Sequence, residues 1–273
     1  MSDFLAVMAE ESSRRARRLR EETSSSGLEA RLREAPPPSP LDVSAPGFDV
    51  IAEAKLSSPS EGRLVSGTNR AGAVLDLARS YAGGGAVAIS VLTEESRFEG
   101  AMAHLETVSA EIRVPVMRKD FLVDPIQVLE ARAAGASGVL LISRMLPGAL
   151  LAEMTDLALA HGMFVLVELF DRSDIEIAAG VFDREVLVGV NCRDLATLEV
   201  DTGRFETLAP HLPDQLPSVA ESGLTSAEDV AVVAALGYRL ALVGSSLVAE
   251  ADPAKRLVEM IAAGRRALTG TAS

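Results

Sequence analysis

The sequence predicts an α/β protein that forms a closed (β/α)8 barrel with an N-terminal helical extension. Short apolar runs rich in β-branched residues alternate with segments of helical periodicity, the pattern of a parallel sheet covered by helices. Eight such units follow one another in about 225 residues, which fits a closed barrel better than an open doubly wound sheet. Five of the apolar runs end on a polar residue, at the position where barrels carry out their chemistry.

The predicted barrel elements follow directly from this alternation. Strands are expected at residues 48–54, 85–92, 113–117, 138–143, 164–168, 186–191, 218–221 and 239–243. Helices are expected at residues 71–82, 101–110, 125–134, 147–161, 172–179, 203–209, 226–236 and 253–267. Near-continuous apolar strands are typical of a parallel sheet that is buried on both faces.

Residues 1–46 are the predicted extension and residues 47–273 the predicted barrel domain. Residues 3–22 have the pattern of an amphipathic helix, and we interpret its basic part, SRRARRLREE, as a solvent-exposed face. The stretches TSSSG and APPPSP then act as breakers between this helix and the barrel.

Local signals support several helix starts. Asp124-Pro125 and Asp252-Pro253 each combine an N-cap residue with proline at the first helical position. Thr225 and Glu228 have the spacing of a capping box. These signals concern structure alone.

Composition excludes several classes of protein. The net charge of −13 argues against general nucleic-acid binding, which needs a basic surface. No apolar run reaches the roughly 18 residues of a membrane helix, and the N-terminus lacks a signal-peptide pattern, so we expect a cytoplasmic protein without membrane association. The single Cys192 excludes an internal disulfide. The three histidines lack metal-ligand spacing, so we expect no metal, and acid–base chemistry falls to Lys, Glu or Asp.

Charged and amide side chains end five of the predicted strands. These residues are Lys55, Lys119, Glu168, Asn191 and Glu221. A charged group in that position must be paired or used, because burying it alone is costly. Glu53 lies two residues before Lys55, so both side chains point into the barrel. The pair is either part of the chemistry or a structural ion pair with Glu168.

Two late loops predict a phosphate site. Glu221-Ser222-Gly223 follows the seventh predicted strand, and Gly244-Ser245-Ser246 follows the eighth. Barrels commonly bind phosphate with these two loops and a short helix N-terminus. Glycine lets the backbone approach the ligand, and a side chain at Gly244 is expected to enter the space of the phosphate.

With these residues in place, the chain resembles the indole-3-glycerol phosphate synthase family over about residues 48–262. The matching stretches are IAEAKLSSPSEG (51–62), ISVLTEESRFEG (89–100), PVMRKDFLVDPIQVLEARAAGA (115–136), LVELFD (166–171), VGVNCRDLATLEVD (188–201), VAESGLTSAEDV (219–230) and LVGSSLV (242–248). The resemblance implies ring closure of an anilino-deoxyribulose phosphate with loss of CO2 and water, in tryptophan biosynthesis. No redox step occurs, so no cofactor is expected.

The resemblance also implies roles for individual residues. Lys119 is expected to be the general acid that protonates the substrate carbonyl, which requires a lowered pKa if it is to act near neutral pH. Glu53 and Lys55 are expected to act near the substrate carboxylate and in the dehydration, with Glu168 as a further acid–base or electrostatic residue. Asn191 and Glu221 resemble groups that orient the anthranilate ring and the substrate hydroxyls.

The remaining family positions concern binding. Lys55, Ser222, Gly223, Gly244 and Ser245 are the expected phosphate ligands. Ser58, Phe98 and Arg193 match substrate-binding positions, although Arg193 is equally suited to hold its loop through Asp194 and Phe98 to plain packing. The expected partners are the phosphorylated small-molecule substrate and other tryptophan-pathway enzymes.

Three departures from the family pattern leave alternatives open. Leu56 and Glu61 replace residues that are usually basic, and Cys192 replaces a common asparagine. A paralogue acting on a modified substrate, or a non-catalytic phosphate-binding barrel partner, is therefore an alternative. A phosphosugar isomerase is disfavoured, because Lys55 and Glu168 stand where such an enzyme needs an Asp/Cys or Asp/Asp pair.

Overall fold

Eight parallel strands hydrogen-bond side by side into a closed barrel in the computed structural model, which describes residues 3–43, 47–58, 62–64, 69–195 and 197–270. The order around the barrel is β1-β10-β9-β8-β7-β6-β5-β4, so each strand neighbours the next barrel strand in the chain. The barrel strands are β1 (Asp49–Ala54), β4 (Ala88–Leu92), β5 (Val116–Lys119), β6 (Gly138–Ile142), β7 (Phe164–Leu169), β8 (Leu187–Asn191), β9 (Ser218–Glu221) and β10 (Leu240–Val243). The predicted fold class is confirmed.

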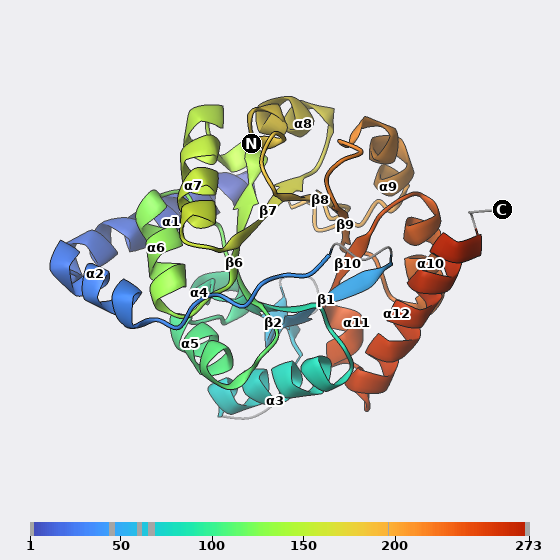
Figure 1. The fold of residues 1–273 in the computed structure, drawn as a ribbon, viewed down its shortest axis with the longest axis horizontal. Coiled ribbons are helices and arrows are strands. Elements are labelled where there is room, and N and C mark those ends of the chain that lie inside the picture. Colours follow the sequence, from blue (N-terminus) through green and yellow to red (C-terminus); the bar gives the residue numbers. More distant parts are fainter. Residues whose placement is uncertain (1–2, 44–46, 59–61, 65–68, 196, 271–273) are drawn as a thin grey trace.

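Helices surround the barrel, and the N-terminal chain passes across one of its ends to reach β1 (Figure 1). The helices are α1 (Asp3–Glu22), α2 (Ser25–Glu34), α3 (Arg70–Gly83), α4 (Glu95–Phe98), α5 (Met102–Glu111), α6 (Pro125–Ala133), α7 (Gly148–Ala160), α8 (Arg172–Ala178), α9 (Gly203–Leu208), α10 (Ala227–Ala235), α11 (Ser245–Val248) and α12 (Pro253–Gly270). Short 3-10 turns occur at Ser143–Met145, Ala179–Val181 and Ala209–His211, and β2 (Ser57–Ser58) pairs antiparallel with β3 (Gly62–Arg63).

The barrel strands are buried on both faces. All five residues of β4, β6 and β8 are buried, and the same holds for all four residues of β9 and β10. One face of each strand packs inside the barrel and the other packs against the helices, which explains the absence of polar alternation in the sequence. Polar residues are therefore concentrated near the carboxyl ends of the strands.

Two local predictions were wrong in detail. The serine stretch after α1 contains a helix start as well as a break, because the Ser24 side chain accepts a hydrogen bond from the Gly27 amide and caps α2. At α10 the capping box is formed by Ser226 and Asp229, one residue later than the predicted Thr225 and Glu228. Asp229 also accepts hydrogen bonds from the amide and hydroxyl of Thr225. The geometry therefore favours the short carboxylate at the third helical position.

Helix α1 docks on the barrel through both its apolar and its basic residues. Leu5 and Met8 are buried in the hydrophobic core. The Arg15 guanidinium lies 2.6 Å from Asp120 and 3.6 Å from Glu94. The interpretation of the basic stretch as a solvent-exposed face is thus wrong for Arg15. Whether residues 1–46 are a separate unit stays a prediction.

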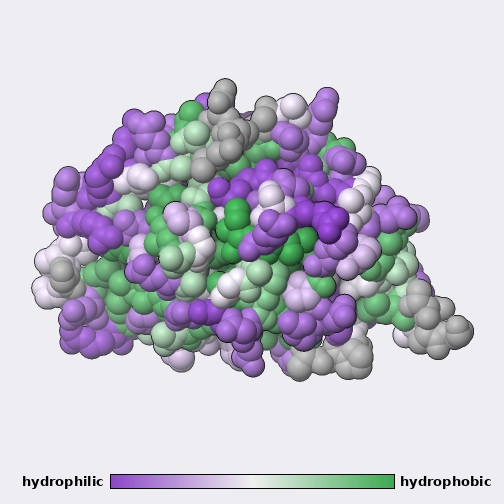
Figure 2. Space-filling model, turned by 90° about the horizontal axis from the view of Figure 1, so that it is seen from above, coloured by the Kyte–Doolittle hydropathy of each residue, from purple (hydrophilic) through white to green (hydrophobic). Residues whose placement is uncertain are grey.

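The outer surface is mainly hydrophilic on the face shown in Figure 2, with apolar residues reaching it in separate strips. Within the described part of the chain, no helix is both long and apolar enough to cross a membrane.

Candidate active site

A cavity of about 650 Å³ opens at the carboxyl ends of the barrel strands and collects nearly all of the predicted site residues. Its lining includes Glu53, Lys55, Phe98, Lys119, Glu168, Asn191, Arg193, Glu221, Ser222, Gly223, Gly244 and Ser245. Residues spread over some 190 positions of sequence meet here because parallel strands bring all their carboxyl ends to one edge. The strand-end prediction therefore located the cavity.

Lys119 is the centre of the charged cluster in this cavity. Its ammonium nitrogen lies 3.1 Å from Oε2 of Glu168 and 3.7 Å from Oε2 of Glu221. Both carboxylates are almost fully buried. The three side chains come from β5, β7 and β9, so a single ammonium faces two carboxylates across the top of the barrel.

The charges around Lys119 reverse the expected direction of its pKa. Burial lowers the pKa of the Lys119 ammonium, but the carboxylates of Glu168, Glu221 and Glu53 raise it by more, and the net pKa lies above the ordinary lysine value. The expectation of a lowered pKa is therefore wrong, because anionic rather than cationic groups surround this lysine. Lys119 carries its proton throughout the neutral range.

At Glu221, unlike at Lys119, burial outweighs the effect of the opposite charge. Burial, followed by repulsion from Glu168, raises its pKa well above the ordinary value, while the charge of Lys119 opposes this shift. Two adjacent carboxylates with one cation near both cannot ionise at equal cost. The arrangement therefore favours the neutral form of Glu221.

Glu53 and Lys55 form a second ion pair beside this cluster. The Lys55 ammonium lies 3.2 Å from Oε1 of Glu53, and both side chains are largely buried. Glu168 accepts a hydrogen bond from Lys119 instead. The predicted alternative of a structural ion pair between Lys55 and Glu168 is therefore wrong. Gly244 lies against this pair: a Cβ there would come 2.7 Å from Oε1 of Glu53 and 3.2 Å from Cε of Lys55. A side chain at Gly244 would thus disturb Glu53 and Lys55 first. The expectation that it would also enter the space of the phosphate stays a prediction.

The two predicted phosphate loops lie against the same cavity and are joined to each other. Ser222 and Gly223 both have left-handed backbone angles, with φ of 68° and 74°. The Ser246 hydroxyl donates to the carbonyl of Leu224, which links the loop after β10 to the loop after β9. Helix α11 begins at Ser245, and the first turn of a helix leaves amide N–H groups that can bind an anion.

Arg193 and Asn191 brace the loop after β8. The Asn191 side chain accepts a hydrogen bond from the Arg193 amide, and the Arg193 guanidinium donates to the carbonyl of Leu198. Arg193 thus supports its loop through Leu198 while it also lines the cavity. Phe98 similarly does both, because it lines the cavity and its ring lies 6.2 Å from that of Phe121.

Ser58 and the two departures that the structure describes, Leu56 and Cys192, are not part of the cavity lining. Ser58 is buried in the β2–β3 hairpin and is absent from the cavity wall. Leu56 and Cys192 are buried in the hydrophobic core, and Glu61 falls outside the described residues. The two departures that the structure describes therefore remove no group from the cavity surface.

Sequence reasoning missed the network that carries the predicted site. The Asp120 carboxylate accepts hydrogen bonds from Arg118, Thr93 and Arg15, and thereby ties the residue after Lys119 to the loop after β4 and to α1. The pKa of Asp120 is lowered: burial raises it, but Arg118 and Arg15 lower it by more. The position of the acidic Asp120 directly after Lys119 was a sequence signal for this network. No sequence signal points to Arg15 on α1 as its partner.

An apolar wall was also missed. It is formed by Leu92, Leu140, Ile142, Leu195, Val200 and Leu242. In near-continuous apolar strands, sequence alone does not say which residues point into the barrel. Such a wall suits an aromatic ring held between charged groups.

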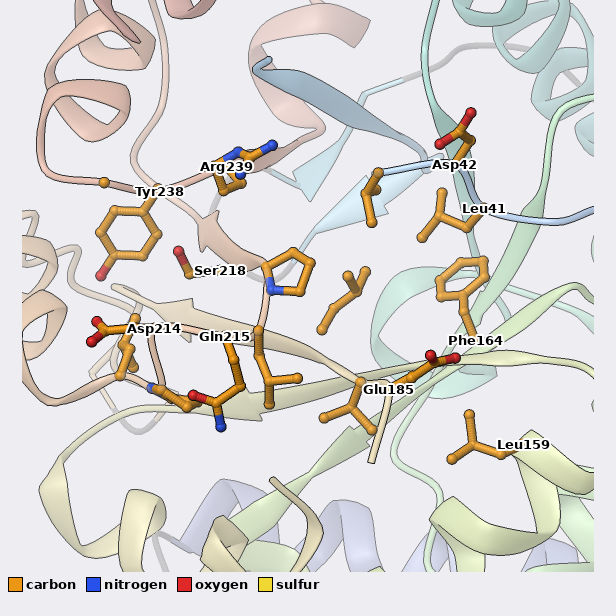
Figure 3. Close-up of a pocket in the computed structure, with 18 of the residues that line it drawn as sticks. Leu41, Asp42, Leu159, Phe164, Glu185, Asp214, Gln215, Ser218, Tyr238 and Arg239 are labelled. Carbon is orange, nitrogen blue, oxygen red and sulfur yellow. The ribbon is translucent and has the colours of Figure 1, made fainter. Parts of the chain in front are cut away.

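A second and larger cavity, of about 1230 Å³, lies at the amino ends of the strands. Figure 3 shows it between the segment around Leu41 and the starts of β7, β9 and β10, with Phe164, Ser218 and Arg239 in its wall. Its acidic residues Asp42, Glu185 and Asp214 are exposed. No group of three or more His, Cys, Asp or Glu side chains suited to a metal occurs among the described residues.

Comparison with known proteins gives one consistent family. The family model described as indole-3-glycerol phosphate synthase matches residues 8–260. The indole-3-glycerol phosphate synthase of Leifsonia xyli subsp. xyli is 46% identical and covers 95% of this chain and 96% of its own. That of Mycobacterium avium is 43% identical and covers 88% of this chain and 87% of its own.

Solved structures show the fold. A 3-hexulose-6-phosphate synthase superposes with a TM-score of 0.61 at 19% identity, covering 79% of this chain and 99% of the other. A thiamine phosphate pyrophosphorylase superposes with a TM-score of 0.58 at 15% identity, covering 81% and 97%. At these identities the likeness concerns the barrel architecture alone.

Proposed function

The chain belongs to the indole-3-glycerol phosphate synthase family, and we propose that it closes the indole ring of 1-(2-carboxyphenylamino)-1-deoxyribulose 5-phosphate with loss of CO2 and water. The observation that carries this proposal is the Lys119 ammonium, held 3.1 Å from Glu168 in a cavity that also contains Glu53, Lys55 and the two phosphate loops. The reaction is carboxy-lyase chemistry in tryptophan biosynthesis.

The substrate is anchored at both of its ends. Its phosphate binds the Ser222-Gly223 and Gly244-Ser245 loops, mainly through backbone N–H groups, with Lys55 as the nearby cation. Its aromatic ring lies against the apolar wall, with Phe98 on that side. Fixing both ends limits the flexible ribulose chain between them to conformations in which the carbonyl approaches the ring.

Ring closure forms a carbon–carbon bond. The aromatic carbon that carries the carboxylate attacks the ketone carbon, and the π electrons of the carbonyl move onto its oxygen. Lys119 gives that oxygen a proton. The high pKa of Lys119 is compatible with this role, because the oxygen becomes strongly basic only as the new bond forms. Glu168 holds the ammonium in position through the hydrogen bond to its Oε2.

Decarboxylation and dehydration complete the indole. The bond from the ring carbon to the carboxylate breaks, its electrons return to the ring, and CO2 leaves. The new hydroxyl then leaves as water after it receives a proton from Lys55, while Glu53 accepts a proton from the adjacent CH2 carbon. The Lys55–Glu53 separation of 3.2 Å supports this division of work, because an acid and a base lie side by side.

Asn191 and Glu221 orient the substrate. Both line the cavity next to Lys119 and Glu168, and they offer an amide and a carboxyl group to the substrate hydroxyls. Arg193 shapes the loop beside them through Leu198. Ser58 is proposed only as a residue that approaches the substrate from the hairpin after β1. The steps involve no redox change, so we expect no cofactor.

A direct assay tests the proposal. The purified chain is incubated with the carboxyphenylamino-deoxyribulose phosphate while indole absorbance is followed, with Lys119→Ala as the inactive control. We expect indole formation by the wild-type chain alone. Absence of indole from a folded chain that still binds the substrate would instead favour a paralogue with a modified substrate or a non-catalytic barrel. Association with other tryptophan-pathway enzymes stays a prediction.

A further inference from the structure

Gly189 lies in the middle of β8, level with Glu168 of β7. In the barrel register Gly189 pairs with Glu168 on one side and with Val219 on the other. Glu221 pairs with Asn191, two residues nearer the carboxyl end of β8. For its carboxylate to come within 3.7 Å of the Lys119 ammonium on β5, the Glu221 side chain extends into the barrel interior. It passes over Gly189 on the way.

The contact between Glu221 and the backbone of Gly189 leaves no room for a side chain. A Cβ at position 189 would lie 2.1 Å from Oε1 of Glu221, 3.2 Å from its Cδ and 3.0 Å from Cδ1 of Leu166. The first distance is far inside van der Waals contact, so the Glu221 carboxylate would have to move. Because that carboxylate is almost fully buried, any movement alters its position relative to Lys119 and Glu168.

We propose that Gly189 is a positioning residue for the charged cluster: the missing side chain creates the space in which the Glu221 carboxyl group lies beside Glu168 and Lys119. This inference rests on the proposed function, because it concerns the acid cluster of that reaction. Gly189 touches no substrate atom in this role and acts through Glu221. A second glycine, Gly244, makes similar room for Glu53.

The hydrogen-bonding state of Glu221 supports this role. Neither oxygen of its carboxyl group meets a hydrogen-bond donor among the described side chains and backbone groups that face it. Two ionised carboxylates cannot bond to each other, because both only accept. A neutral Glu221 can donate to Glu168, in keeping with the raised pKa of Glu221, which follows from burial and from Glu168. The space over Gly189 therefore lets the Glu221 carboxyl group lie where Glu168 raises its pKa and Lys119 is 3.7 Å away.

The decisive variant is Gly189→Ala, measured in the full chain. We expect kcat to fall by about 10- to 100-fold, the loss that a displacement of about 1 Å produces in a catalytic group. KM should change less than kcat, because the phosphate loops and the apolar wall are untouched and only the contact of Glu221 with the substrate hydroxyls is displaced. The pH profile of kcat should shift as well, because the raised pKa of Glu221 depends on its burial and on its distance from Glu168 and Lys119. A purely structural role would not move that profile.

Gly138→Ala is the matched control. Gly138 is also buried in a barrel strand, and a Cβ there would lie 2.4 Å from the ring of Phe164, at the amino end of β6 and β7. We expect this variant to lose thermal stability and to keep the kcat and the pH profile of the wild type. If both alanine variants change the pH profile alike, the effect is a general consequence of barrel strain and the inference is wrong.

A double-mutant cycle with Glu221→Ala completes the test. In the Glu221→Ala background only Cδ1 of Leu166, at 3.0 Å, still limits the space over residue 189, so Gly189→Ala should lower kcat and thermal stability much less than it does in the wild type. The inference is overturned if the two losses add in full, or if Gly189→Ala leaves kcat and its pH profile unchanged.

The stability arm of the cycle needs no substrate. If Gly189→Ala fails to fold, the double variant Gly189→Ala/Glu221→Ala must fold, and its failure to do so would refute the contact. If the wild-type chain forms no indole, the proposed function fails, while the same thermal cycle still decides whether Gly189 and Glu221 are coupled.

Discussion

The two ends of the barrel each carry a cavity, and the larger one is not where the charged cluster lies. The cavity at the amino ends measures about 1230 Å³ and the one at the carboxyl ends about 650 Å³. At the amino end the acidic groups Asp42, Glu185 and Asp214 are exposed to solvent (Figure 3). At the carboxyl end Glu168 and Glu221 are each only 1% exposed and face a common ammonium.

The difference shows that desolvated charge, rather than volume, indicates the site. A solvent-exposed carboxylate can stay hydrated, whereas a buried one must be compensated by groups of the protein. Clusters of groups with shifted pKa values are typical of functional sites. In this barrel such a cluster joins three strands at the carboxyl end, where the loops of a barrel carry its chemistry.

The largest expected effect at the carboxyl end is that of Lys119→Ala. General acid catalysis contributes about 10²- to 10⁴-fold, so kcat should fall by that range while circular dichroism shows an intact fold. Product binding should persist in part, because the phosphate loops are unchanged. Steady-state kinetics would contradict the assignment if the variant kept half of the wild-type kcat.

The next effect concerns the phosphate loops. Ser245→Asp places a negative charge at the start of α11, and its repulsion of the phosphate should raise KM by about 10-fold or more, since each 1.4 kcal/mol of lost binding is tenfold. The value of kcat should change much less. Ser245→Asn is the neutral control of similar size.

Competitive inhibition by inorganic phosphate provides the readout without turnover. It should weaken in Ser245→Asp and persist in Ser245→Asn. Equal phosphate inhibition in both variants would mean that the anion binds elsewhere. This pair replaces a test at Gly244, where a side chain would also displace Glu53 and Lys55.

A smaller effect is expected on stability. Because the folded-state pKa of Glu221 is raised by burial and by Glu168, its stabilising contribution is complete below the unfolded value near 4.5 and is lost as pH rises through the folded value. Glu221→Gln removes this loss. The Tm of Glu221→Gln minus the Tm of the wild type should therefore grow from acidic toward alkaline pH. Each kcal/mol of difference in the free energy of unfolding corresponds to about 2–4 °C in Tm.

Thermal melts at several pH values check this prediction in the absence of substrate. The Tm difference between Glu221→Gln and the wild type should be smallest at acidic pH. A difference that stays constant from acidic to alkaline pH would show that Glu221 titrates normally. The activity of the same variant should fall, since stability and function place opposite demands on a buried carboxyl group.

The smallest effect is expected at the amino end. Glu185→Gln combined with Asp214→Asn changes two exposed groups beside the larger cavity, and stability should stay within about 0.5 kcal/mol per substitution. Values of kcat and KM should match the wild type. A tenfold loss of kcat in this variant would break the contrast between the two ends.

Most of the fold followed from local patterns. Each predicted strand and helix of the barrel has an observed counterpart, because β-branched runs and helical periodicity are encoded over short stretches. The strand-end residues also pointed to one cavity, since parallel topology alone brings them together. Helix α2 was missed because the serines before it serve both as a break and as the Ser24 cap.

What the sequence by itself determined is the list of chemical groups and the end of the barrel on which they stand. The alternation of elements fixed the barrel, and the polar strand ends fixed Lys119, Glu168 and Glu221 as its charged residues. These properties are local or follow from topology, so they need no knowledge of contacts between distant positions.

Only the tertiary structure decided how these groups act on one another. The direction of the Lys119 pKa shift depends on three carboxylates from other strands. The docking of Arg15 on Asp120 joins residues 105 positions apart, and the room for Glu221 depends on the absence of a side chain at Gly189. Charge interactions and steric exclusion act through space over a few ångströms, and the sequence does not state which distant residues come that close.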